Sequence, residues 1–195
     1  MALRTTGRLV GALFLLAILC YGTGSAIAPH LAGTVLLLLN SVVVVTLGTL
    51  AFRAFHPWHA RAARIYLVAR CMEAVLLAAG VVLLISALPE PADIVYQVAM
   101  LSLGVGSLPI LAALRRDRWL PGWLAVWGLA GYTLLAIGAV AELLGFGLGL
   151  ALSIPGGLFE VVSGVILLFR GFPEPALAPT ALAAPDTDHE TVPYA

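Results

Sequence analysis

The sequence predicts an all-α, polytopic membrane protein: a bundle of six transmembrane helices with both termini in the cytoplasm. Three observations predict this fold class. Of the 195 residues, 62% are hydrophobic and only 10% are charged, with a mean hydropathy of +1.06, whereas soluble domains carry about 25% charged residues. The apolar residues form runs long enough to cross a bilayer. The arginines gather in alternate segments between those runs.

The first predicted span runs from about residue 8 to residue 28, behind Arg4 and Arg8. The apolar part of a secretory signal peptide has about 7–15 residues, which is shorter than this run, and more apolar runs follow it. We therefore expect the first span to be retained. Ala26-Ile27-Ala28 resembles a cleavage site, so cleavage after Ala28 stays an alternative that would leave five crossings.

The second and third spans are predicted at about residues 31–52 and 62–87, joined by the loop Arg53–His59. The second span carries Asn40 near its middle. A side-chain amide at this depth most often hydrogen-bonds to a neighbouring helix. We interpret Asn40 in that way, with a ligand contact as the less favoured reading.

The third span is unusual because it carries charges well inside its apolar run. A helix turns about 100° per residue, so Tyr66, Arg70 and Glu73 fall on one face, and the opposite face is apolar. A charged side chain near the bilayer centre costs about 2.5–3.5 kcal/mol on insertion scales. The charged face should therefore turn toward protein or trapped water and away from lipid.

The last three spans are predicted at about residues 94–114, 122–144 and 154–170. Between the first two of them, Arg115-Arg116-Asp117-Arg118 precedes three tryptophans at four-residue spacing, as is typical of a membrane interface. Ser153-Ile154-Pro155 is a plausible start for the sixth helix. Residues 173–195 are rich in Pro and Ala without periodicity, which predicts a disordered cytoplasmic tail after the transmembrane domain of residues 1–172.

The arginines set the predicted orientation. All but Arg70 flank one side of the six spans, and the other side receives His30, Glu90 and Asp93. Under the positive-inside rule the arginine side is cytoplasmic. A bacterial inner membrane, that is, a multi-pass location in the plasma membrane, is the expected setting.

Two further glutamates lie inside apolar runs, at Glu142 in the fifth span and Glu160 in the sixth. Each lies on a stripe of small residues of the kind that lets helices approach closely. Together with the groups above they form a candidate intramembrane polar cluster of Asn40, Tyr66, Arg70, Glu73, Glu142 and Glu160. Such a cluster could bind an anion at Arg70 or relay protons through Glu73 and Glu160. Alternatively, it is a structural network that fixes the register of the helices, and we favour this reading slightly.

The sequence shows no catalytic motif, cofactor motif or metal-ligand spacing. His56 and His59 are three residues apart but have no carboxylate or cysteine near them in the sequence. The net charge of zero gives no sign of nucleic-acid binding, which needs a basic surface. We therefore expect no catalytic, cofactor-binding or metal-binding residues, no cofactor and no nucleic-acid partner.

Four stretches resemble the DUF4386 family: RLVGALFLLAILCYGTG near the N-terminus, Arg70-Cys71-Met72-Glu73, Leu114–Tyr132, and Ile154–Phe172. DUF4386 is a family of bacterial multi-pass membrane proteins with no established biochemical activity. The resemblance therefore implies a membrane topology and supplies no substrate. It covers most of residues 8–172, although Gly122 and Ile166 stand where the family often has a basic residue and a tryptophan.

These observations leave two main classes of function. The first is binding or movement of a small molecule or ion through the cluster around Arg70, Glu73 and Glu160. The second is a non-catalytic membrane module that assembles with a partner protein or with a second copy of itself. An intramembrane enzyme ranks last. The lipid bilayer is an expected partner in every case.

Overall fold

The computed structural model describes residues 2–173, which form five α-helices and no strand. The helices are α1 (Leu3–Ile27), α2 (Leu31–Ile85), α3 (Pro89–Arg116), α4 (Gly122–Leu143) and α5 (Gly149–Arg170). All five are long and apolar enough to cross a membrane. The all-α class is therefore confirmed. Apart from Pro173, the predicted tail lies outside the described residues.

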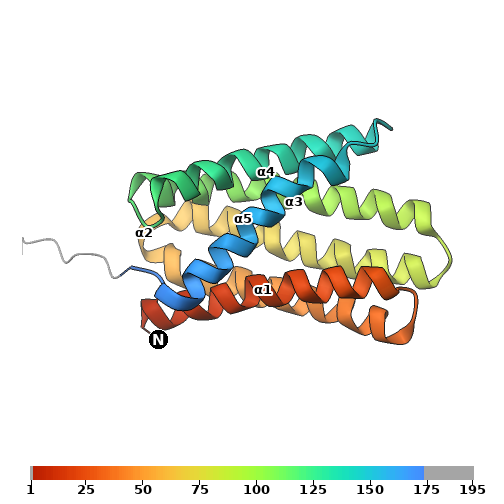
Figure 1. Cartoon of the computed structure of the whole chain (residues 1–195), viewed down its shortest axis with the longest axis horizontal. Helices are drawn as coiled ribbons and strands as arrows, with labels where there is room; N and C mark the ends of the chain where they lie inside the picture. Colours follow the sequence, from red (N-terminus) through yellow and green to blue (C-terminus); the bar gives the residue numbers. More distant parts are fainter. Residues whose placement is uncertain (1, 174–195) are drawn as a thin grey trace, which may run out of the picture.

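Helix α2 is a hairpin of two arms. Its 55 residues would rise about 80 Å as one straight helix, far more than the roughly 30 Å of a hydrocarbon core. The backbone of His59 is non-helical (φ −140°, ψ 58°), shortly after Pro57, and the chain reverses direction in this region (Figure 1). Consistent with the reversal, a Cβ added to Gly48 would lie 2.7 Å from the Arg70 Cβ.

The bundle is closed by its first and last helices. Each helix packs on its neighbours in sequence, and α5 returns to pack on α1. The N-terminus and the end of α5 consequently lie at the same end of the molecule (Figure 1). The buried core between the helices includes Leu47, Leu103, Leu124 and Phe159.

Glycines set the closest approaches between helices. A Cβ added to Gly11 of α1 would lie 2.5 Å from the Leu168 backbone nitrogen and 2.6 Å from the Gly164 carbonyl oxygen of α5. A Cβ added to Gly131 of α4 would lie 3.0 Å from the Gly156 Cα. Small residues therefore let α5 touch both neighbours backbone to backbone.

The structure differs from the sequence-based expectation where α5 begins. The helix starts at Gly149 rather than near Ile154, so Ser153 and Pro155 lie inside it. Ser153 Oγ donates to the Leu150 carbonyl at 2.8 Å and does not cap the helix start. The reason is a carboxylate on the preceding helix, Glu142, which accepts a hydrogen bond from the Gly149 N–H and so supports an earlier start.

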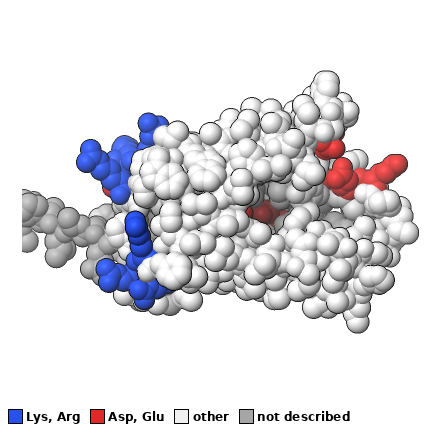
Figure 2. All heavy atoms as spheres, in the orientation of Figure 1, with Lys and Arg blue, Asp and Glu red and all other residues white. Residues whose placement is uncertain are grey.

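Charges are segregated along the long axis of the bundle. Figure 2 shows arginines at one end, acidic groups at the other, and an almost uncharged flank between them. On the face of α2 opposite Arg70, the apolar side chains of Val68, Met72 and Val75 are 58%, 48% and 68% exposed. An apolar belt between two charged ends is the architecture of a multi-pass membrane protein.

Candidate functional site

Arg70, in the second arm of α2, is the centre of a buried polar network. The residue is only 2% exposed. Its Nε donates to the Tyr66 hydroxyl at 2.9 Å, and its Nη1 donates to Glu73 Oε2 at 2.9 Å. Positions i−4, i and i+3 share one helix face, so the two local contacts follow directly from the sequence.

Two further side chains reach Arg70 from other helices. Arg70 Nη2 donates to Glu160 Oε1 of α5 at 3.0 Å, and Glu160 Oε1 also accepts a 2.6 Å hydrogen bond from the Tyr132 hydroxyl of α4. The Arg70 Nη2 also lies 3.4 Å from the Tyr132 hydroxyl oxygen. We call Tyr66, Arg70, Glu73, Tyr132 and Glu160 the Arg70 cluster. It links α2, α4 and α5.

The Arg70 cluster holds two carboxylates against one guanidinium. The side chains of Arg70, Glu73 and Glu160 are 3%, 6% and 16% exposed. The Arg70 guanidinium carbon also lies 5.2 Å and 5.5 Å from the ring centroids of Tyr66 and Phe14. With all three groups ionised the cluster has a net charge of −1, in surroundings where charge interactions are poorly screened.

A cavity of about 250 Å³ borders the Arg70 cluster on the side nearer the acidic end of the bundle. Arg70, Glu73, Tyr132 and Glu160 line it, together with residues of α1, α2 and α3. The flank of the molecule is hollowed, and an acidic group is visible within the hollow (Figure 2). We call this space the open cavity.

Aromatic rings and one amide complete the walls of the open cavity. Tyr21 of α1 stacks on Tyr96 of α3 with ring centroids 5.6 Å apart, and Phe14 lies beside them in the lining. Asn40 also lines the cavity; it is 3% exposed, and its Oδ1 has no hydrogen-bond partner within residues 2–173. A buried acceptor of this kind is normally satisfied by water or a ligand.

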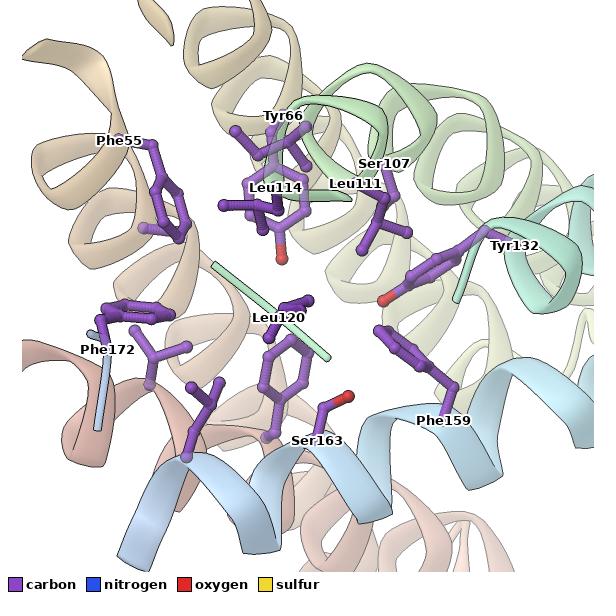
Figure 3. A pocket seen from close by; sticks show the side chains of 15 residues that line it. Phe55, Tyr66, Ser107, Leu111, Leu114, Leu120, Tyr132, Phe159, Ser163 and Phe172 are labelled. Atoms are coloured by element: carbon purple, nitrogen blue, oxygen red, sulfur yellow. The ribbon is translucent and has the colours of Figure 1, made fainter. Parts of the chain in front are cut away.

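A second, smaller cavity, of about 60 Å³, has a lining that includes Leu120 and Phe172 (Figure 3). The hydroxyls of Tyr66 and Tyr132 point into it, and Phe14 and Tyr132 line both cavities. Otherwise its walls are mainly aliphatic and aromatic, including Phe55 and Phe172. Phe55 packs edge-on against Phe172 and against Trp119 at 4.9 Å and 5.4 Å. One end of this smaller cavity is therefore lined by packed aromatic rings.

Of the predicted cluster, the structure brings Tyr66, Arg70, Glu73 and Glu160 together and places Asn40 in the wall of the same cavity. Sequence reasoning missed Tyr132. Its signal was its position on the small-residue stripe of α4, between Gly131 and Leu135, all three of which are buried.

Glu142 does not join the Arg70 cluster. It lies in the last turn of α4, and its Oε2 accepts a 2.7 Å hydrogen bond from the Gly149 N–H at the start of α5. The first N–H groups of a helix have no partner within the helix, and a carboxylate there is stabilising. Glu142 is thus a helix cap rather than a site residue.

We expect the Glu142→Ala variant to lose about 1 kcal/mol of stability, the usual cost of removing a helix cap. Glu142→Gln is the matched control, since its amide oxygen can still accept the hydrogen bond from Gly149. Thermal unfolding of the purified protein in detergent measures both. Equal melting temperatures for the two variants would contradict the capping role.

His59, at the α2 reversal, has a structural partner. His59 Nε2 lies 2.7 Å from Asp117 Oδ2, just after α3. A hydrogen bond from Arg116, at 3.2 Å, lowers the pKa of the Asp117 carboxyl below its ordinary value, and His59 adds to this effect. No group of three or more His, Cys, Asp or Glu side chains within residues 2–173 could hold a metal ion.

A scan against protein-family models matches residues 90–171 to DUF4386, a domain of unknown function. This segment of the chain is similar to the DUF4386 family. The match contains two of the four stretches on which the resemblance was based, Leu114–Tyr132 and most of Ile154–Phe172. The N-terminal stretch and Arg70–Glu73 lie outside it. No curated protein and no solved structure matches the chain.

The Arg70 cluster is shared between the DUF4386 segment and the residues that precede it. Tyr132 and Glu160 lie within residues 90–171, whereas Tyr66, Arg70 and Glu73 lie before them. The guanidinium therefore joins the DUF4386 helices to α2.

Proposed function

We propose that the protein crosses the plasma membrane six times, with both termini in the cytoplasm, and binds a small organic cation at the Arg70 cluster. Six crossings follow if each arm of α2 counts as one, because the reversal at His59 divides its 55 residues into two membrane-length pieces. Arginines at one end of the bundle support the orientation under the positive-inside rule.

The observation that carries the cation assignment is the charge of the cluster. Arg70 already donates to both Glu73 and Glu160, so little of its charge is left for an anion. Two carboxylates against one guanidinium leave an excess negative charge, and a buried excess charge draws in a counter-ion or a proton. Glu160 is the more accessible of the two carboxylates, at 16% side-chain exposure against 6% for Glu73.

The walls favour an organic cation over a metal ion. Phe14, Tyr21, Tyr96 and Tyr132 line the open cavity, and aromatic faces attract ammonium groups by about 0.5–2 kcal/mol each. A volume of about 250 Å³ holds a small ammonium compound. The hollow is on the apolar flank (Figure 2), so a cation with apolar substituents could enter from the bilayer.

We expect benzyltrimethylammonium, at about 100 times its Kd, to raise the melting temperature of the wild-type protein by about 5–10 °C. The Glu160→Gln variant should keep its fold, because the amide can still accept from Arg70 and Tyr132, but should lose this increase. Glu90→Gln, which removes an exposed carboxylate at the start of α3, is the matched control. It should respond as the wild type does.

Benzoate and sodium chloride at the same ionic strength complete the design. If benzoate raises the melting temperature and benzyltrimethylammonium does not, the site binds an anion at Arg70, and the cation assignment is wrong. If benzyltrimethylammonium raises the melting temperature of Glu160→Gln as much as that of the wild type, the cation binds elsewhere than at the Arg70 cluster. Uptake of both probes into proteoliposomes that contain the protein is measured as well. If neither probe shifts the melting temperature and neither is taken up, assembly with a partner protein becomes the better account.

A further inference from the structure

At the arginine-rich end, a groove of about 650 Å³ lies next to the smaller cavity, with which it shares Leu120, Leu167 and Phe172, and apart from the open cavity. Four arginines from separate parts of the chain line it: Arg4 of α1, Arg115 at the end of α3, Arg118 of the following loop and Arg170 at the end of α5. We call it the arginine groove. We infer that the arginine groove binds the headgroup of an anionic phospholipid.

The fold holds these like charges together. Gly7 and Gly171 let the start of α1 approach the end of α5 closely. A Cβ added to Gly171 would overlap the Arg4 carbonyl oxygen, and a Cβ added to Gly7 would overlap the Gly171 and Phe172 backbone. This approach brings Arg4 close to Arg170, the residue before Gly171. Asp117, the carboxylate nearest to Arg115 and Arg118 in the sequence, pairs with Arg116 and His59 instead. Within residues 2–173 none of the four groove arginines forms an ion pair.

The rest of the lining matches an amphiphile. Trp119, Leu120 and Ile166 form apolar walls next to the four guanidinium groups. Tryptophan beside arginine at the end of an apolar belt marks the headgroup level of a bilayer, and basic pockets between helices at this level bind phosphate-bearing headgroups. A phospholipid would place its phosphate among the arginines and its acyl chains along the flank of α5.

The test is lipid binding by the full-length protein in detergent at physiological ionic strength, measured by native mass spectrometry. Wild type should bind phosphatidylglycerol more tightly than phosphatidylcholine. Removing two arginines by R115Q/R118Q should weaken the binding of phosphatidylglycerol about 30-fold, which corresponds to about 2 kcal/mol of binding free energy. Phosphatidylcholine binding should change little. R53Q/R64Q removes two exposed arginines of α2 at the same end, outside the groove, and should stay within about threefold of wild type.

Three results would overturn the inference. An equal loss in R53Q/R64Q would mean that general surface charge, rather than the groove, attracts the lipid. If inorganic phosphate displaces bound lipid as effectively as added phosphatidylglycerol does, the arginine groove is a site for free phosphate. The chain's own acids Glu174, Asp186, Asp188 and Glu190 are a rival occupant. If neutralising those four tightens lipid binding tenfold or more, the acidic segment is the natural occupant.

Discussion

The Arg70→Ala variant is expected to lose about 3–5 kcal/mol of stability, the largest effect of any substitution considered for this protein. The guanidinium donates to Tyr66, Glu73 and Glu160 at 2.9–3.0 Å. Without it, two carboxylates would share a buried site with no cation between them. At least one of them would have to take up a proton or draw water into the bundle, and either change costs stability.

Arg53→Ala is the control, because Arg53 is an exposed arginine in the same helix. The free energy of unfolding of Arg53→Ala should lie within about 0.5 kcal/mol of that of the wild type. Replacing the whole ionic set by R70M/E73Q/E160Q should recover much of the loss, since it leaves no buried charge unpaired. If Arg70→Ala and Arg53→Ala unfold alike in detergent, the cluster is not the ionic centre described here.

The second large effect is expected at Gly11, where α1 meets α5. The added Cβ of Gly11→Ala would lie 2.5 Å from the Leu168 nitrogen and 2.6 Å from the Gly164 carbonyl oxygen. Both are backbone atoms, so no side chain can rotate away and the two helices must separate. We expect a loss of about 3 kcal/mol, at the upper end of the usual cost of overpacking.

Gly22→Ala tests whether the effect is local to the contact. Gly22 is in the same helix, but a Cβ there would meet nothing within 4 Å, so the higher helix propensity of alanine should leave stability unchanged or raise it by up to about 1 kcal/mol. Thermal unfolding of the two variants side by side gives the comparison. A Gly11→Ala variant as stable as Gly22→Ala would mean that α1 does not pack tightly on α5.

Two physical rules predicted part of the site from the sequence: the periodicity of a helix and the cost of burying a charge. Tyr66, Arg70 and Glu73 share a face because helix periodicity puts them there. Glu160 was selected because a carboxylate inside an apolar run needs a partner. The helix that supplies this partner is determined by how the helices pack. The hydrophobic pattern of a single sequence does not show that packing.

Glu142 and Tyr132 were misjudged for opposite reasons. Glu142 carries a charge in an apolar run, but its place in the last turn of α4 puts it beside the start of α5, where an unpaired N–H was available. Tyr132 carries no formal charge, so its hydroxyl drew no attention until the structure placed it 2.6 Å from Glu160. Similarly, the hairpin at His59 was expected as a loop, whereas helical structure continues on both sides of a single non-helical residue.

The most direct test of the central claim is a crystal structure with a bromine-labelled cation, such as 4-bromobenzyltrimethylammonium. The account predicts an anomalous bromine peak inside the open cavity, with the ammonium group facing the Glu160 carboxylate and the ring among Phe14, Tyr21 and Tyr96. No such peak should occur with Glu160→Gln at the same cation concentration. A peak on the outer surface, or an unchanged peak in the variant, would contradict it.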